Sequence, residues 1–104
     1  MPYVITRCWY PNHLVDEVAK KYIENLEKFP SNESISKTIV PAAVSTTKDG
    51  IETISIDEVE SQKLSDAIEH DALFMAEYRN IKGFRYETKV WATVEEAMKN
   101  IGMG

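Results

Sequence analysis

The stretch "ISKTIVPAAVSTTKDGIETISIDEV", residues 35–59, decides the fold because it predicts two strands joined by a tight turn. β-Branched residues fill both halves, and Lys48-Asp49-Gly50 lies between them. Asp-Gly between two such runs is a strong signal for a β-hairpin. Proline lacks the N–H that a strand ladder needs, so Pro41 predicts that the first of the two strands lies at a sheet edge or carries a bulge.

The segment before this hairpin predicts a strand followed by a helix. "PYVITRCWYP", residues 2–11, is rich in Val, Ile, Tyr and Trp and ends at a proline. Asn12 is then a candidate helix N-cap, and Pro30 is expected to end the helix. Apolar residues recur every three or four positions, which predicts one buried face made of Val15, Val18, Tyr22, Leu26 and Phe29.

The segment after the hairpin repeats this alternation in the opposite order. A second helix is expected from about Gln62 to Asn80, ended by the turn at Gly83, and "FRYETKVWA", residues 84–92, predicts a fourth strand. Thr93 and Glu96 have the spacing of a capping box, which opens a short terminal helix. The apolar residues of the second helix form one stripe of Leu64, Ile68, Ala72 and Met75, with Ala67, Phe74 and Tyr78 beside it.

The expected order of elements is therefore βαββαβ with a short helix at the end. A chain of 104 residues is enough for one domain, so residues 1–104 are interpreted as a single unit. This order predicts an α+β, ferredoxin-like sandwich in which two helices cover one face of a four-stranded antiparallel sheet. In that arrangement the second strand lies at an edge, which agrees with Pro41.

Composition excludes several classes of function. The formal net charge of −5 argues against a nucleic-acid surface, which needs Lys and Arg to neutralise phosphates. Cys8 is the single cysteine, so neither an internal disulfide nor a thiolate-rich metal site is expected. The N-terminus lacks the pattern of a signal peptide, and no apolar run is long enough to span a bilayer. We expect a cytoplasmic protein without membrane or nucleic-acid partners, metal or cofactor.

Alternation along the strands predicts which side chains share a face of the sheet. In the fourth strand the even positions are mostly apolar, and in the third strand Ile54 and Ile56 are even, so the even residues of both strands are expected beneath the helices. The first strand is expected to pair antiparallel with the fourth, which would place the odd residues of both on the other face. The predicted neighbours are Arg7 with Glu87, Trp9 with Arg85, and Tyr3 with Trp91.

The face without helices would then carry several large apolar side chains among its charges: Tyr3, Ile5, Trp9 and Trp91. Contiguous apolar surface of this kind usually marks a contact with another molecule. We therefore expect an isologous homodimer in which the two sheets face each other.

The same features resemble a known group of proteins. The βαββαβ order, the passage "NIKGFRYETKVW" (residues 80–91) and the Trp-bearing first strand are similar to the dimeric α/β-barrel members of the ferredoxin-like folds. This group includes proteins resembling antibiotic-biosynthesis monooxygenases and muconolactone isomerases. The resemblance implies that two sheets close into a barrel and that each subunit binds a small molecule between its sheet and its helices.

On that implication, a pocket would be lined by the even strand residues and the inner helix stripes. The candidate ligand-binding residues are Cys8, Tyr10, Tyr22, Phe74, Tyr78 and Tyr86, with Thr6 and Thr88. Aromatic rings with hydroxyl groups at their tips are typical of small-molecule sites, and they are also typical of ordinary cores. His13, at the start of the first helix, is expected at the pocket mouth or simply in solvent. We expect Cys8 to behave as a small buried apolar residue.

Asp71 is the candidate general base. It falls between Ala67 and Phe74 in an otherwise apolar stripe, where loss of water would favour its protonated form. The alternative is a carboxylate at the edge of the stripe that faces solvent or is hydrogen-bonded to a tyrosine hydroxyl. His70 is the second catalytic candidate, although it points about 100° away around the helix.

Three functions remain open from the sequence. The first is cofactor-independent proton transfer or oxygenation of a small apolar or aromatic molecule, with Asp71 as base. The second is a binding or regulatory module without catalysis. The third is a purely structural dimer with a filled core.

Overall fold

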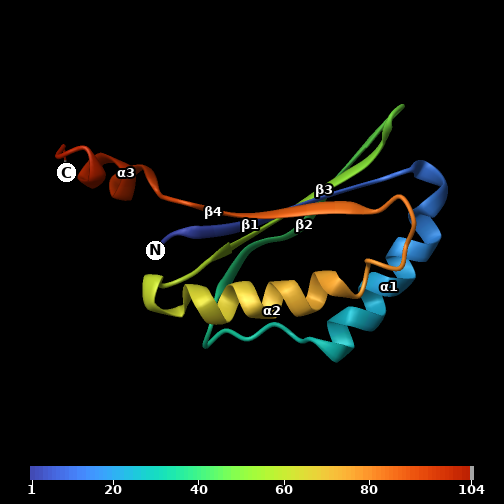
Figure 1. Ribbon diagram of the computed structural model, residues 1–104, viewed down its shortest axis with the longest axis horizontal. Helices are drawn as coiled ribbons and strands as arrows, with labels where there is room; N and C mark the ends of the chain where they lie inside the picture. The colour runs from blue at the N-terminus through green and yellow to red at the C-terminus, as the bar shows by residue number, and fades with distance from the viewer. Residues whose placement is uncertain (104) are drawn as a thin grey trace.

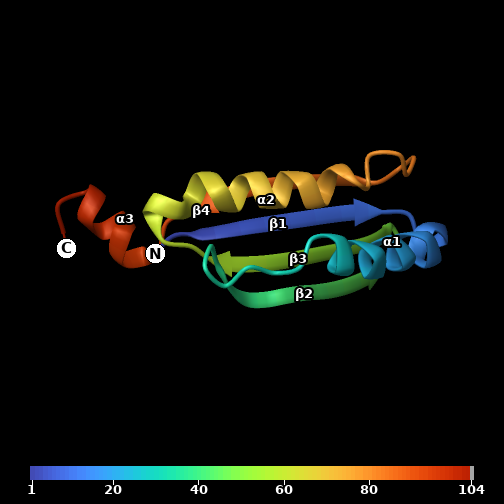
Figure 2. The same ribbon diagram turned by 90° about the horizontal axis from the view of Figure 1, so that it is seen from below.

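The computed structural model describes residues 1–103, which form one four-stranded antiparallel sheet with helices on one face (Figures 1 and 2). The strands are β1 (Tyr3–Tyr10), β2 (Lys37–Thr47), β3 (Gly50–Glu58) and β4 (Arg85–Trp91). The helices are α1 (Val15–Lys28), α2 (Leu64–Ala76) and α3 (Val94–Asn100), and short 3₁₀ turns, η1 (Asn12–Leu14) and η2 (Ser61–Lys63), precede α1 and α2. The strand order is β2-β3-β1-β4. The expected ferredoxin-like arrangement is confirmed.

The two central helices cover the same face of the sheet, but at different places. Figure 2 shows α2 along β4 and β1, and α1 beyond it towards β3, at the end where β1 runs into η1. The face that α1 and α2 cover is called the helix-side face below, and the opposite one the helix-free face. The third helix, α3, extends past the end of β4 and away from both layers (Figure 1).

The hairpin of residues 35–59 forms as its sequence predicts. β2 lies at the edge of the sheet, and its register with β3 shifts between Thr38 and Val40 and again between Val40 and Ala43. These shifts lie beside Pro41, the residue that cannot donate to the ladder. Gly50 follows the turn with φ of +129°, and a Cβ atom there would lie 2.7 Å from the Tyr10 carbonyl oxygen. Only glycine fits this position without strain.

The predicted register between β1 and β4 is confirmed. The paired residues are Tyr3 with Trp91, Arg7 with Glu87, and Trp9 with Arg85. Odd residues of both strands therefore share the helix-free face, as expected. The ion pair of Arg7 differs from that expectation, because its guanidinium pairs with Glu52 of β3 and lies over the Trp9 ring at 5.1 Å.

The face assigned to β3 was wrong. β1 and β3 pair so that Ile5 meets Ile56 and Arg7 meets Ile54, and odd residues of β1 thus lie beside even residues of β3. Ile54 and Ile56 consequently lie on the helix-free face, and Thr53, Ser55 and Asp57 lie beneath the helices. The prediction placed these isoleucines beneath the helices because it rested on the assumption that the apolar side of a strand always faces the helices.

The first two helices begin later than predicted, and the second also ends earlier. Asn12 does not cap a helix; it lies in η1, and its side-chain amide donates to the Thr47 carbonyl oxygen at 3.3 Å, which ties this corner to the hairpin. The second helix begins after η2 and ends at Ala76, short of Asn80, because residues 77–83 form turns instead. The capping box of α3 is confirmed, with Thr93 and Glu96 bonded reciprocally.

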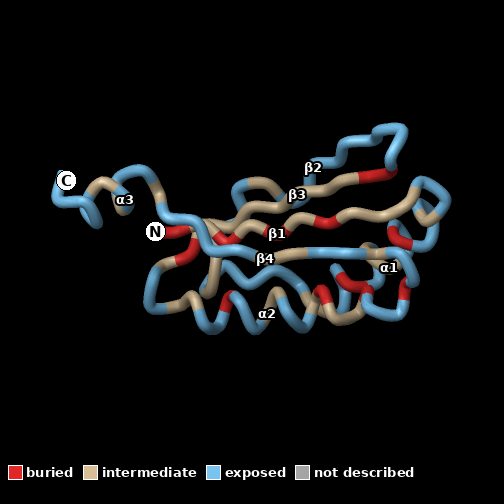
Figure 3. The backbone as a smooth tube through the Cα atoms, turned by 45° about the horizontal axis from the view of Figure 1, so that its top comes forward, coloured by how far each residue is buried: buried red, intermediate tan, exposed pale blue. Residues whose placement is uncertain are grey.

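The buried faces of α1 and α2 also differ from the predicted apolar stripes. On α1, Val18 and Asn25 are buried, whereas Leu26 is 47% exposed. On α2, the stripe that faces the sheet contains Ala67, with Phe74 and Tyr78 following it, whereas Ile68 is exposed. Figure 3 shows the buried segments concentrated along β1 and the inner sides of these helices.

The core consists of two small groups of buried residues on the helix-side face. One group lies under the α1 end of the sheet, and its members are Cys8, Val18, Met75, Tyr78 and Ile81. The other lies at the start of α2 and contains Val4, Val59 and Ala67. No helix within residues 1–103 has the length and apolar composition to cross a lipid bilayer.

Candidate functional site

A carboxylate bonded to two hydroxyl groups lies between the two core groups. Thr6 of β1 donates from Oγ1 to Oδ1 of Asp71 at 2.9 Å, and Thr88 of β4 donates from Oγ1 to Oδ2 at 2.7 Å. The two threonines are opposite each other in register, and their hydroxyl oxygens are 3.4 Å apart. We call these three residues the Asp71 cluster. Asp71 therefore faces the sheet from α2, and both of its oxygens have partners.

Other polar groups of β3 extend this cluster along the helix-side face. Burial raises the pKa of Asp57 and the negative charge of Asp71 raises it further, while a hydrogen bond from Thr38 and the nearby His70 oppose the shift. Burial also raises the pKa of the Cys8 thiol, a hydrogen bond with Thr53 opposes this, and Asp71 adds to it. A neutral thiol is a poor nucleophile. Cys8 is thus a buried structural residue, as its sequence context indicates.

The tyrosines expected to line a pocket belong to one continuous aromatic array. Tyr10 stacks on Phe84 at 5.8 Å between ring centroids, and Phe84 stacks on Tyr78 at 4.6 Å. Phe74 lies 6.1 Å from Tyr78 and 6.3 Å from Tyr22. The array begins at β1 and reaches α1 across the end of α2. Tyr10, Tyr22, Phe74 and Tyr78 thus belong to one array, in which Phe84, not among the candidates, links Tyr10 to Tyr78.

The remaining candidates are placed at the margins. Tyr86 points to the helix-side face from the edge strand β4 and is 43% exposed. His70 is half-buried, and its Nε2 lies 3.2 Å from the Pro30 carbonyl oxygen, so it connects α2 to the loop after α1. His13 is exposed in η1, near the corner where β1 ends. Neither histidine is hydrogen-bonded to Asp71.

Sequence reasoning missed two polar residues of this face. Asn25 is 1% exposed, and its amide donates to the Phe74 carbonyl oxygen at 3.2 Å. Burial raises the pKa of Tyr78, and a hydrogen bond with Asn25 opposes that shift. Asp57 was missed because β3 was assigned the wrong face. The position of Asn25, seven residues after Val18, was the available signal, since that spacing returns to the same side of a helix.

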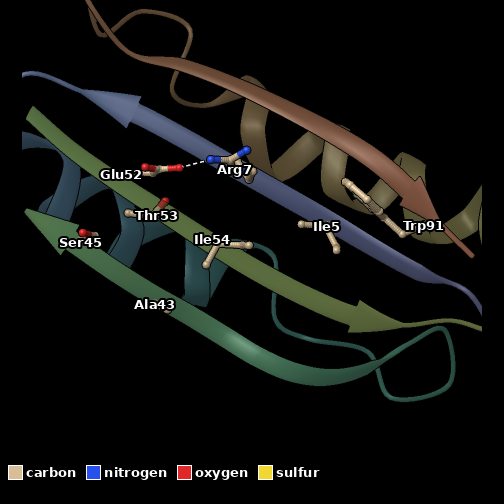
Figure 4. A pocket seen from close by; sticks show the side chains of 8 residues that line it. All are labelled: Ile5, Arg7, Ala43, Ser45, Glu52, Thr53, Ile54 and Trp91. Atoms are coloured by element: carbon tan, nitrogen blue, oxygen red, sulfur yellow. Dashed lines mark hydrogen bonds and ion pairs between the residues drawn. The ribbon is translucent and has the colours of Figure 1, made fainter. Parts of the chain in front are cut away.

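The two faces of the sheet differ from those of an ordinary two-layer sandwich. At the centre of the helix-side face lie hydroxyl groups and carboxylates, whereas the helix-free face carries an aliphatic patch, defined here as Ile5, Val40, Ala43, Ile54 and Ile56. Charged residues border this patch along β4, where Arg85, Glu87 and Lys89 alternate in sign. Figure 4 shows Ile5 and Ile54 next to the Arg7–Glu52 ion pair, with Trp91 towards the far end of β4.

Two hollows open on the surface around this patch. The first, of about 390 Å³, lies over the patch itself, and its lining includes Ile5, Ala43, Ile54 and Trp91 (Figure 4). The second, of about 460 Å³, lies at the end of the sheet where β1, the hairpin turn and the start of β4 meet; we call it the corner hollow. It is lined by Trp9, Tyr10, Pro11, Thr47, Asp49, Gly50, Ile51, Glu52, Gly83 and Arg85. Asp71 lines neither hollow.

Comparison with known proteins gives the fold and nothing finer. No protein-family profile matches the chain, and no curated protein sequence matches it. Among solved structures, the de novo designed protein Foldit4 is similar, with a TM-score of 0.53 over 88% of this chain and 97% of that one, at 10% sequence identity. Such a likeness to a designed protein supports the α+β arrangement of strands and helices.

The arrangement can support acid–base chemistry more readily than metal chemistry. Within residues 1–103, no group of three or more His, Cys, Asp or Glu side chains is spaced to hold a metal ion. Asp71 is the polar centre of the helix-side face, and the two threonine hydroxyls fix the plane of its carboxylate. A carboxylate held in a fixed orientation is suited to accept a proton from, or a hydrogen bond from, a molecule bound beside it.

Proposed function

We propose that the protein is a homodimer whose subunits join through their helix-free faces and bind a small apolar or aromatic molecule beside Asp71, on the helix-side face. The observation that carries this proposal is the distribution of side chains between the two faces. The sheet directs its aliphatic patch away from its own helices and directs a bonded carboxylate towards them. A monomer would leave the apolar side in water.

The aliphatic patch supports the dimer. A sheet needs a second layer to bury an apolar face, and in a sheet-on-sheet contact that layer lies about 10 Å away. Four cations and three acids surround the patch, namely Arg7, Lys37, Arg85, Lys89, Glu52, Glu58 and Glu87. A face of mixed charge with an apolar centre favours a second copy of itself over a strongly charged partner.

The edge of β4 supports the position of the ligand. On the helix-side face, Tyr86 and Val90 are 43% and 47% exposed, and Thr88 between them is half-buried. These residues form an open strip beside α2, and its central residue, Thr88, belongs to the Asp71 cluster. An aromatic ring bound on this strip would contact Tyr86 and place its polar group near Asp71.

The chemistry suited to this strip is proton transfer within the bound molecule, with Asp71 as the base. Each Asp71 oxygen accepts a hydrogen bond from a threonine hydroxyl. These two bonds orient the carboxylate and prevent it from rotating towards solvent. The resemblance to isomerase-like and monooxygenase-like dimeric barrels agrees with chemistry that needs no bound cofactor. A binding module without catalysis would use the same strip, and a purely structural dimer would leave it empty.

Sedimentation equilibrium at about 20 µM tests the dimer. The wild-type protein is expected to have twice the monomer mass, and Ile54→Glu is expected to be monomeric because it places a charge in the aliphatic patch. Val44→Glu is the matched control, since Val44 lies on the same hairpin, is 63% exposed and points to the other face. A monomeric wild-type protein would refute the proposed assembly.

Native mass spectrometry tests the ligand. A small molecule retained through purification is expected to be present in the wild-type protein and in Asp66→Asn, and reduced in Asp71→Asn. Asp66 is the control because it is an exposed aspartate on the same helix. Turnover of the identified molecule by wild type and its loss in Asp71→Asn would indicate an enzyme, and retention without turnover a binding module. Absence of any retained or added aromatic ligand would leave only the structural dimer.

A further inference from the structure

We propose that α3 of one subunit docks in the corner hollow of a second copy, so that the dimer is held by two exchanged helices as well as by the two sheets. This inference rests on the proposed dimer. It assigns a partner to the one helix that does not pack on its own sheet and an occupant to a hollow that the rest of the fold leaves open.

The helix α3 presents an apolar face to solvent. Val94, Met98 and Ile101 follow one another at spacings of four and three and therefore lie on the same side of the helix. Val94 is 71% exposed and Ile101 is 68% exposed, although both are aliphatic. The helix is shaped by its own capping box, and the N-terminal amine bonds to Glu96 on its other side. Its apolar face is thus formed and unoccupied in a single subunit.

The corner hollow has a matching composition. Trp9, Tyr10, Pro11 and Ile51 supply apolar surface, and the charged residues of its lining are Asp49, Glu52 and Arg85. Among residues 1–103, Arg85 has no ion-pair partner, and neither has Glu95 in the first turn of α3. The hollow is part polar and part apolar, and its Glu52 is already paired with Arg7. Its apolar part fits the apolar face of α3, and its free cation, Arg85, fits the acid beside that face.

The helix and the hollow lie at opposite ends of the same subunit. Figure 1 shows α3 at one end of the sheet and the hairpin turn and the β1–α1 corner at the other. The overall extent along this direction is 48 Å. Therefore α3 cannot reach its own corner hollow, and only a second molecule in the reverse orientation can bring the two together.

This orientation results from a two-fold axis that lies between the two facing sheets and runs across the strands at the level of Thr88. Residues equally distant from Thr88 along β4 then lie opposite each other, so Lys89 faces Glu87 of the second copy, and Trp91 faces its Arg85. In β3 the same axis, which crosses at Ser55 by the observed register, sets Ile54 against Ile56. In β1 the axis crosses at Thr6, so Tyr3 faces Trp9 of the second copy and Ile5 faces its Arg7. The isoleucines of β3 thus meet each other, and opposite charges meet along β4.

The same axis carries α3 to the corner hollow. Three residues beyond Thr88, Trp91 lies over Arg85 of the second copy, and Val94, six residues beyond, lies at the level of residue 82. Gly83 and Arg85 both line the hollow. Two pairs of residues are unfavourable in this orientation, since Glu52 faces Glu58 and Ile5 faces Arg7. Glu52 and Arg7 are already paired with each other, and Glu58 has Lys37 as its strand neighbour. The arrangement is closed and symmetric, as isologous dimers are.

The dimer dissociation constant of Val94→Glu and Ile101→Glu tests the docking. Each is expected to raise the constant by about tenfold or more, because each places a charge in the apolar part of the contact. The control is Ile23→Glu on α1, whose side chain is similarly exposed at 62% and does not line the corner hollow. It is expected to change the constant by less than about twofold.

An exchange of charges tests the orientation. Arg85→Glu and Glu95→Arg are each expected to weaken the dimer by roughly fivefold, and the double variant is expected to restore it. The inference is overturned if Val94→Glu and Ile101→Glu dimerise as tightly as wild type, or if the double variant is no tighter than the single ones. Should these variants leave the dimer intact while Ile54→Glu is monomeric, the sheet contact stands and only the helix docking fails. A monomeric wild-type protein would refute both the sheet contact and the helix docking.

Discussion

Thr6 and Asp71, 65 residues apart in sequence, share a hydrogen bond of 2.9 Å that joins the centre of the sheet to the middle of α2. Thr6 is 4% exposed and Asp71 is half-buried, so this polar bond is partly shielded from solvent. The second oxygen of Asp71 bonds to Thr88 on the neighbouring strand. The helix is therefore positioned over β1 and β4 by a polar anchor between two small apolar cores.

Replacing Thr6 by valine is expected to destabilise the protein by about 1–3 kcal/mol, because it keeps the volume of the side chain and removes one partner of a half-buried carboxylate. Thr46→Val, at an exposed position of β2, is the control and should change stability by less than about 0.5 kcal/mol. Urea denaturation of the three proteins gives the comparison. An equal stability of both variants would show that Asp71 does not depend on the anchor.

The raised pKa of Asp57 predicts a pH dependence of stability. Because the folded state holds the proton more tightly than the unfolded state, the contribution of Asp57 is favourable at acid pH and is lost as the pH rises through the raised folded pKa. Asp57→Asn removes this titration. Its stability relative to wild type should therefore increase from about pH 3 to about pH 7. Denaturant titrations across this range measure the difference, and a constant or decreasing difference contradicts the expectation.

Cys8 is expected to react slowly with thiol reagents in the folded protein. It is 9% exposed, and burial raises the pKa of its thiol, so little thiolate is present near neutral pH. Alkylation by iodoacetamide, followed by mass spectrometry, should be slow in buffer and rapid in denaturant. Reaction at the same rate in both conditions would show that the thiol is accessible.

Asn25→Ala is expected to cost more stability than Leu26→Ala, contrary to the usual order for polar and apolar residues. Asn25 is buried and donates to the end of α2, so its loss leaves a buried carbonyl oxygen without that partner, at about 1–3 kcal/mol. Leu26 is 47% exposed, and its truncation removes few contacts. Thermal unfolding of both variants tests the order, and the reverse order would place Leu26 in the core.

The order of the elements was predictable because each boundary has a local cause. Asp49-Gly50 makes a turn wherever it lies between two strands, and Thr93 with Glu96 caps a helix whatever surrounds it. Alternation also placed Arg7 opposite Glu87 correctly, since β1 and β4 show the same parity. Asp71 was predicted to lie on the inner stripe of α2, and the structure places it there with two threonine partners that no local pattern indicates.

The face of β3 was not predictable from its own residues. Ile54 and Ile56 are apolar whichever face they occupy, and this sheet has apolar side chains on both faces: Val4 and Cys8 lie beneath the helices, and Ile5 lies on the helix-free face. Only the register decides between them. In β1 and β3 the paired residue numbers sum to 61, as for Ile5 and Ile56, and in β1 and β4 they sum to 94, as for Tyr3 and Trp91. An odd sum reverses the parity, and an even sum keeps it.

By itself the sequence determined the strand and helix order, the hairpin, the edge position of β2 and the capping of α3, because turns, caps and prolines act within a few residues. The tertiary structure decided which side of each element is buried: Asn25 in place of Leu26, Asp57 beneath the helices, and the aliphatic patch on the open face. The physical reason is that burial depends on hydrogen-bond register and on the direction from which a neighbouring layer approaches. Both are set by contacts between residues that lie far apart in the chain.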